Sequence, residues 1–225
     1  MIRHIPVKAL ALLLLSGLIT GCATPTPYDY TAFKQSNPAS IVVLPPINKS
    51  PDIKASYSLL SHVTLPLAEA GYYVLPVALV DETFKQNGLM NADEMHMAPP
   101  AKLHEIFGAD AALYIEVSEY GSSYKVVTSE VAVTANAKLI DLRNGQLLWA
   151  GNARASTAEN QNNSGGGLIG LLVTAAVNQI INTLSDRGHE VAGIASQRLL
   201  TANTPNGILH GPRAPQPTQT QLAAQ

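Results

Sequence analysis

The sequence predicts an α/β (α+β) protein with a single mixed β-sheet of about five strands, on which helices pack. In the first half of the chain, short apolar runs alternate with segments whose apolar residues recur at helical spacing. A long stretch then has two-residue periodicity, which is typical of half-buried strands in an antiparallel hairpin. Segments of helical composition follow it. We therefore expect a C-terminal antiparallel hairpin and two C-terminal helices.

The chain begins with the features of a signal peptide, which we assign to residues 1–21. A basic start precedes an apolar run at residues 9–19, which is too short to cross a bilayer as a helix. The run leads into Leu-Ile-Thr-Gly-Cys at residues 18–22, which resembles the lipobox of bacterial lipoproteins. That resemblance implies cleavage before Cys22, a diacylglycerol on its thiol and an N-acyl lipid on its new amino group. The alternative is an ordinary cleaved signal that happens to precede a cysteine.

Prolines divide the mature chain into a central domain and two polar ends. Residues 22–39 are expected to form a lipidated, Pro-rich tether and residues 203–225 a disordered tail. The tail lacks the apolar surface that would offset the entropy of ordering it. A single α/β domain is expected between them, over residues 40–202. The formal net charge of −2 argues against binding to nucleic acid. The single cysteine excludes an internal disulfide.

Short strands and helices are expected to alternate through the first part of this domain. The strands are expected at residues 41–44, 72–75 and 111–119, and the helices at residues 53–70, 77–86 and 101–107. Residues 41–44 are apolar throughout, which is typical of a strand buried on both faces. Pro66 should kink the first helix and Gly71 should end it. Residues 89–98 are expected to be a loop.

The hairpin is predicted within residues 125–155, where apolar residues occupy most odd positions on both arms. A two-residue turn at Asn144-Gly145 would pair odd with even positions and split the apolar face. A three-residue turn over residues 143–145 instead pairs Leu139 with Trp149. We therefore predict the three-residue turn, with its glycine left-handed in a β-bulge.

Two helices are expected after the hairpin, at residues 168–184 and 186–200, with a flexible loop at residues 159–167 before them. The first helix is apolar around most of its circumference, yet its apolar run is too short to span a bilayer. Its excess apolar surface must enter the core, a subunit interface or the lipid. The candidate interface residues are Leu168, Ile169, Leu172, Val173, Ala176 and Ile180.

No catalytic motif is evident, because the chain has no Gly-x-Ser-x-Gly elbow and no thiol other than the lipidated one. We therefore expect a protein that is not an enzyme and that carries no cofactor besides its lipid. Met95, His96 and Met97 offer ligands that would suit copper, but methionines in a loop also serve as contacts to partners, and no metal is assigned. Strand alternation places Glu116 and Glu119 on opposite faces, which argues against a shared acid–base site.

Three segments together resemble a known family. They are IVVLPPINKS at residues 41–50, GADAALYI at residues 108–115 and LIDLRNGQLLW at residues 139–149. In this order they resemble a bacterial lipoprotein family of unknown function that includes a neisserial surface antigen. They are distantly similar to the curli-secretion lipoprotein superfamily and to the N-terminal domain of the Tol periplasmic propeller protein. The resemblance covers most of residues 40–202 and implies an anchored α/β domain in envelope assembly or trans-envelope transport.

We therefore expect a membrane-anchored lipoprotein that binds partners in an envelope assembly or transport complex. By resemblance, Ala23 in place of aspartate favours the outer membrane, and we expect the domain to face the periplasm, with the cell surface as the alternative. The expected partners are outer membrane lipid, other envelope lipoproteins or transport components, and further copies of the chain. The alternative function is that of an accessory lipoprotein which binds a small molecule or metal for a transporter. A hydrolase is a third alternative, for which no nucleophile and base are visible.

Overall fold

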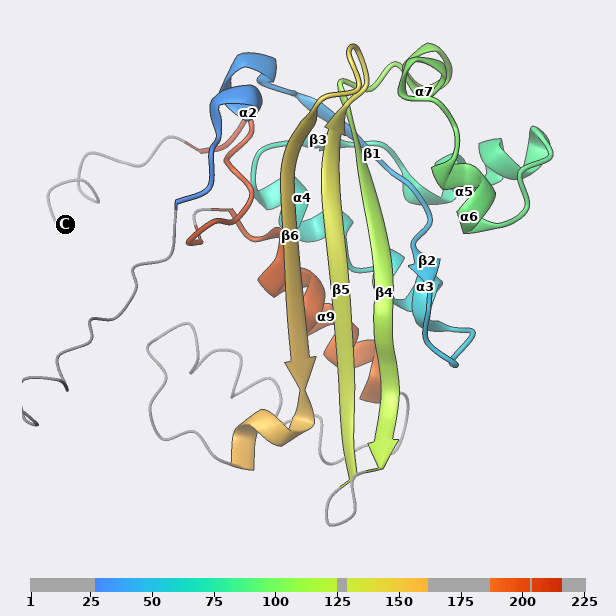
Figure 1. Cartoon of the computed structure of the whole chain (residues 1–225), viewed down its shortest axis with the longest axis vertical. Helices are drawn as coiled ribbons and strands as arrows, with labels where there is room; N and C mark the ends of the chain where they lie inside the picture. The colour runs from blue at the N-terminus through green and yellow to red at the C-terminus, as the bar shows by residue number, and fades with distance from the viewer. Residues whose placement is uncertain (1–26, 125–128, 162–186, 203, 216–225) are drawn as a thin grey trace, which may run out of the picture.

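The computed structural model describes residues 27–124, 129–161, 187–202 and 204–215. It confirms the predicted α/β class, with one six-stranded mixed sheet and helices packed on it (Figure 1). The strands are β1 (Ser40–Val43), β2 (Ile47–Asn48), β3 (Tyr73–Val74), β4 (Ala111–Tyr124), β5 (Ser129–Asp141) and β6 (Leu147–Ser156). The helices are α2 (Thr31–Ser36), α3 (Ala55–Leu60), α4 (Thr64–Glu69), α5 (Val77–Gln86), α6 (Ala92–His96), α7 (Pro100–Phe107), α9 (Arg187–Leu200) and the 3-10 helix η1 (Thr157–Gln161).

The sheet joins a short parallel part to a long antiparallel part. Its strand order is β3-β1-β4-β5-β6, and β2 pairs with β4 beyond the end of β1. β1 runs parallel to β3 and β4, whereas β4, β5 and β6 form an antiparallel meander. β1 is buried on both faces, as predicted, because Val43 enters one apolar core and Val42 enters the other.

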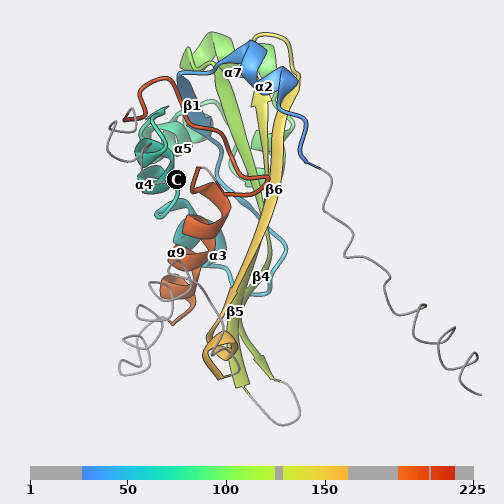
Figure 2. The same ribbon diagram turned by 90° about the vertical axis from the view of Figure 1, so that its left-hand side faces the viewer.

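The two faces of the sheet are covered unequally. α3, α4 and α9 lie on one face and enclose the larger apolar core against the long strands (Figure 2). α5, α6 and α7 enclose a smaller core against β1 and the start of β4. Among the described elements, no α-helix covers most of this second face along β5 and β6, where Asn136, Lys138 and Asn152 are exposed. No helix in the described part of the chain has the length and apolar character that a bilayer crossing requires.

Two local predictions in the first half are wrong. The helix expected over residues 53–70 is divided into α3 and α4. Pro66 lies in the first turn of α4, where its missing N–H needs no partner, and a continuous helix would drive its ring into the carbonyl of residue 62. The loop expected over residues 89–98 contains α6, because the Asn91 side chain caps that helix by accepting from the Glu94 N–H at 2.9 Å.

The predicted pairing of Leu139 with Trp149 is confirmed, but the turn and the bulge differ from the prediction. The Asp141 N–H donates to the Gln146 carbonyl, so the turn comprises residues 142–145 and not 143–145. Leu139 pairs with Trp149, and Gly145 has a φ of +75°. The next pair joins Ile140 to Leu147, so the extra residue is Leu148 and not the turn glycine. The bulge allows Leu148 and Trp149, which are neighbours in sequence, to enter the same core, whereas a regular strand would place them on opposite faces.

Both ends of the domain extend beyond the expected boundaries of 40–202. At the N-terminal end, α2 forms within the expected tether, and Phe33 is only 3% exposed. At the C-terminal end, Ile208 is 1% exposed in the same core, and the Gly211 N–H donates to the Ala70 carbonyl at 2.8 Å. The expected tether over 22–39 and disordered tail over 203–225 are therefore both too long. Each end supplies apolar and aromatic groups that the other end and the sheet bury, which local composition does not reveal.

A buried carboxylate ties α2 to the start of the β5–β6 turn. Asp141 is 1% exposed and accepts hydrogen bonds from Ser36 Oγ at 2.6 Å and Arg143 Nη2 at 2.7 Å. Burial by itself would raise the pKa of Asp141. The hydrogen bonds and the positive charge of Arg143 outweigh that effect and lower the pKa to about 2. Asp141 therefore stabilises the fold in its charged form.

We expect acid to weaken this link. The pKa of Asp141 is lower in the folded chain than in the unfolded chain, so its contribution is fully present above pH 4 and is lost as the pH falls toward 2. The shift corresponds to about 1–2 kcal/mol once the solvent exposure of Arg143 is allowed for. Urea unfolding at pH 7, 4 and 2 should show Asp141→Asn less stable than the unmodified chain at pH 7 and less sensitive to acid. Asp93→Asn, at an exposed ion pair with Lys49, is the control. Identical pH profiles for Asp141→Asn and the unmodified chain would contradict this account.

Candidate functional site

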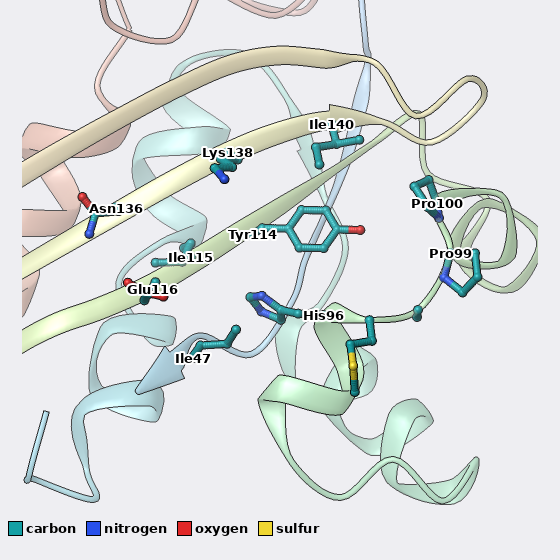
Figure 3. Close-up of a pocket in the computed structure, with 12 residues that line it drawn as sticks. Ile47, His96, Pro99, Pro100, Tyr114, Ile115, Glu116, Asn136, Lys138 and Ile140 are labelled. Carbon is teal, nitrogen blue, oxygen red and sulfur yellow. The ribbon is translucent and has the colours of Figure 1, made fainter. Parts of the chain in front are cut away.

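A groove lies where the connection between α6 and α7 faces the open side of β4 and β5 (Figure 3). Its volume is about 540 Å³. The lining residues are Ile47, His96, Met97, Ala98, Pro99, Pro100, Tyr114, Ile115, Glu116, Asn136, Lys138 and Ile140. The two strands supply most of the polar part of the lining and α6 adds His96, whereas β2 and the α6–α7 connection supply most of the apolar part.

Four polar side chains from neighbouring strands form the floor of the groove, and we call them the polar floor: Tyr114, Glu116, Asn136 and Lys138. Tyr114 pairs across the strands with Lys138, and Glu116 pairs with Asn136, so the four side chains stand together on one face. In the described part of the chain, none of these side chains makes a hydrogen bond or ion pair with another residue. A phenol, a carboxylate, an amide and an ammonium group are therefore available to a ligand.

His96 forms one side of the groove and is held in a defined tautomer. Its Nε2 lies 2.9 Å from the Pro45 carbonyl oxygen, which can only accept, so Nε2 carries the proton and Nδ1 is left as an acceptor. The ring meets Tyr114 edge-on, with centroids 5.2 Å apart. Burial lowers the pKa of His96, which favours the neutral ring. Burial also raises the pKa of Tyr114, so its hydroxyl stays protonated and can donate.

The chemistry of the groove suits binding. Pro99 and Pro100 offer an apolar wall at one end of the groove, and Ile47 lies at the other end (Figure 3). No serine, threonine or cysteine is among the lining residues, so the groove contains no side-chain nucleophile of those types. A ligand with an apolar side and separate donor and acceptor groups would match this arrangement.

The three residues considered for copper do not converge. Met95 is 1% exposed in the smaller core, whereas Met97 is 73% exposed. His96 lies between them with Nε2 bonded to Pro45. Successive residues of a helix point about 100° apart, which explains why the three side chains diverge. No group of three or more His, Cys, Asp or Glu side chains in the described ranges could hold a metal ion.

The expected placement of Glu116 and Glu119 on opposite faces is wrong. The pairing of β4 with β5 shifts between Val117 and Glu119, so Ser118 is an extra residue and Glu119 returns to the face of Glu116. Glu119 accepts from Thr134 Oγ1 at 2.8 Å and pairs with Arg154 Nε at 3.2 Å. It is therefore part of a cross-strand ion pair, and the groove contains only Glu116.

The groove itself was not predicted from the sequence. The sequence signal for it was the alternation of Tyr114 and Glu116 with Ile115 and Val117 in the strand predicted at residues 111–119, where the two apolar residues enter the core. Two sequence-predicted sites, Cys22 and the interface helix at residues 168–184, lie outside the described residues. The lipid and the self-association that they imply stay predictions.

The fold and the groove define an α/β domain with a sheet that helices cover unequally and with a groove on its more open face. The chain belongs to the family described as "Putative lipoprotein GNA1162-like", which matches residues 28–213. This confirms the lipoprotein family predicted from the sequence. Membership of that family makes the chain a membrane-anchored protein of the cell envelope.

Relatives in Neisseria support this assignment. The chain is 55% identical over 186 residues to "Putative lipoprotein NMB1124/NMB1162" of Neisseria meningitidis serogroup B (strain ATCC BAA-335 / MC58), covering 83% of this chain and 86% of the relative. The crystal structure of lipoprotein GNA1162 from Neisseria meningitidis matches with 54% identity and a TM-score of 0.53, over 65% of this chain and 100% of that one. A PelC dodecamer structure from Paraburkholderia phytofirmans matches with 14% identity and a TM-score of 0.39, over 78% and 91% of the two chains.

Proposed function

We propose that this chain is a lipid-anchored, non-enzymatic component of an envelope assembly or transport complex, and that it binds a partner protein in the groove. The observation that carries the proposal is the polar floor. Its carboxylate and ammonium groups lie on an open sheet face and make no hydrogen bond or ion pair with another described residue. Opposite charges placed in this way make binding specific for a partner that presents the complementary pattern, and they fix the register in which that partner binds.

The groove suits an extended segment of a partner protein. Glu116 and Lys138 can each meet a charge of opposite sign, while the apolar wall can receive an apolar side chain. Met97 is 73% exposed beside this wall, and a flexible thioether at the surface is typical of a protein contact. The proposal includes the lipid on Cys22 and, because Ala23 follows it, residence at the outer membrane.

Charge reversal in the groove tests the proposal. We expect Lys138→Glu to reduce the recovery of co-purifying envelope proteins by at least about tenfold, which corresponds to 1.4 kcal/mol of lost binding free energy. The measurement is the native mass of the gently detergent-extracted protein, with quantification of what co-purifies. Lys54→Glu makes the same change at an exposed lysine outside the groove and should leave recovery unchanged. An unchanged assembly for Lys138→Glu, or equal losses for both variants, would contradict binding through the groove.

One observation favours a second candidate, which is a small-molecule ligand. The groove volume of about 540 Å³ lies within the range of ligand pockets. A ligand bound there must raise the melting temperature, because it stabilises the folded state by mass action. A screen of polar metabolites on the delipidated chain should then give a shift that Tyr114→Ala abolishes. Recovery of a partner protein, together with no shift in melting temperature in the screen, would favour the first candidate.

A further inference from the structure

The first described residues of the chain are hydrogen-bonded to β6 and to the C-terminal segment of the domain. The Tyr28 N–H donates to Asn206 Oδ1 at 3.0 Å, and the Tyr28 hydroxyl accepts from the Ala150 N–H at 3.1 Å. We call these three residues the Tyr28 clamp. It joins the N-terminal segment to the outer edge of β6 and to the C-terminal segment at once.

The clamp is continued by the residues that follow. The Tyr30 hydroxyl donates to the Gly207 carbonyl, and Phe33 is buried in the larger core. At the end of α2, Arg143 Nη2 donates to the Ser36 carbonyl at 2.8 Å. The segment from Tyr28 to Ser36 is therefore attached along its length and cannot serve as slack between the domain and a membrane.

This attachment shortens the tether. From Cys22 to Tyr28 there are six residue steps, and a fully extended chain covers at most about 20 Å over that number. A tether that ended at Ser40 would have eighteen steps and could reach about 60 Å. The bound of about 20 Å holds for any path of the intervening residues.

We propose that this short tether holds the α2–β6 side of the domain against the lipid surface of the membrane. The proposal rests on the lipid at Cys22, which is part of the proposed function. It also places the groove, because Ala150 of the clamp pairs with Lys138 of the polar floor, and Lys138 pairs with Tyr114. Neighbouring strands are about 4.8 Å apart, so Lys138 and Tyr114 of the polar floor lie within about 10 Å of Ala150. The polar floor is therefore close to the point where the tether joins the domain. Its partner must then present a membrane-proximal segment.

Two labelled positions test the orientation. The chain's natural cysteine carries the lipid, so an introduced cysteine provides a unique thiol for a fluorophore. Asn152→Cys places the label at an exposed position on β6, two residues beyond Ala150. Ile53→Cys places the label at a residue that is 89% exposed. Its neighbour Asp52 lies beside Gly121, near the other end of β4, because Asp52 Oδ2 is 3.8 Å from the point that a Cβ on Gly121 would occupy. The full-length lipidated protein is reconstituted in phosphatidylcholine vesicles whose head groups carry a quencher.

We expect several-fold stronger quenching at position 152 than at position 53. Inserting a Gly/Ser linker of about 15 residues after Thr26 should remove most of the difference, because a flexible linker of that length adds about 20 Å of root-mean-square reach. Equal quenching at the two positions, or quenching unaffected by the linker, would overturn the proposal. Vesicle flotation separates this result from a failure of the anchor. Protein that does not float lacks the lipid on which both proposals rest, whereas protein that floats with equal quenching overturns the orientation alone.

Discussion

Replacing Trp149 with alanine is expected to lower the free energy of unfolding by about 3–5 kcal/mol. The indole is 1% exposed in the larger core, and its Nε1–H donates to the Asn206 carbonyl at 3.0 Å. It lies so close over Gly151 that a Cβ there would come within 2.2 Å of Trp149 Cζ2. Truncation would open a cavity, leave the Asn206 carbonyl without its donor and weaken the Tyr28 clamp. Urea denaturation of the delipidated chain measures the effect.

Two variants separate the causes of this loss. Leu147→Ala, on the same strand at a residue that is 46% exposed, should change stability by less than about 1 kcal/mol. Trp149→Phe keeps much of the apolar bulk and removes the donor, so it should have an intermediate effect. A loss below about 1 kcal/mol for Trp149→Ala would show that the indole is not part of the cooperative core.

Replacing Cys22 with serine is expected to release the protein from the membrane fraction. The thiol is the predicted attachment point of the diacylglycerol, and each buried methylene of an acyl chain contributes about 0.8 kcal/mol to membrane binding. Membrane fractionation and metabolic labelling with a palmitate analogue measure the loss.

The matched control is Thr24→Ala, two residues after the lipobox, which should remain labelled and membrane-bound. If the Cys22→Ser variant stays in the membrane fraction without label, protein contacts, and not the lipid, hold the domain there. Label retained by Cys22→Ser would place the lipid on another residue and contradict the lipobox assignment.

Local patterns predicted several elements well. α5 has the predicted bounds of 77–86, and Gly108 ends α7 with a φ of +64°. The β5–β6 register followed from a turn glycine and a two-residue alternation, so Leu139 faces Trp149 as expected. In each case the cause lies within a few residues of its effect, because helix ends and turns depend on the conformation of one or two residues.

The groove needed information that no local pattern contains. Strand alternation predicts that Glu119 and Glu116 lie on opposite faces of the sheet. The bulge at Ser118 places them on the same face, and that bulge is defined by the pairing of β4 with β5. The polar floor depends in the same way on Tyr114 meeting Lys138 across the strands. Cross-strand neighbours far apart in sequence are set by register, which one extra residue changes.

By itself the sequence determined the fold class and the pairing of Leu139 with Trp149, which follow from local composition and spacing. Its resemblance to a known family indicated the lipoprotein family. The signal and lipobox stay predictions. Only the tertiary structure decided where the domain begins and ends and which residues line the groove. Tyr28 becomes part of the fold because Asn206 and Ala150 bind it, and those partners lie more than a hundred residues away along the chain. Such contacts depend on the assembled sheet, so the length of the tether and the position of the groove could be known only from the folded chain.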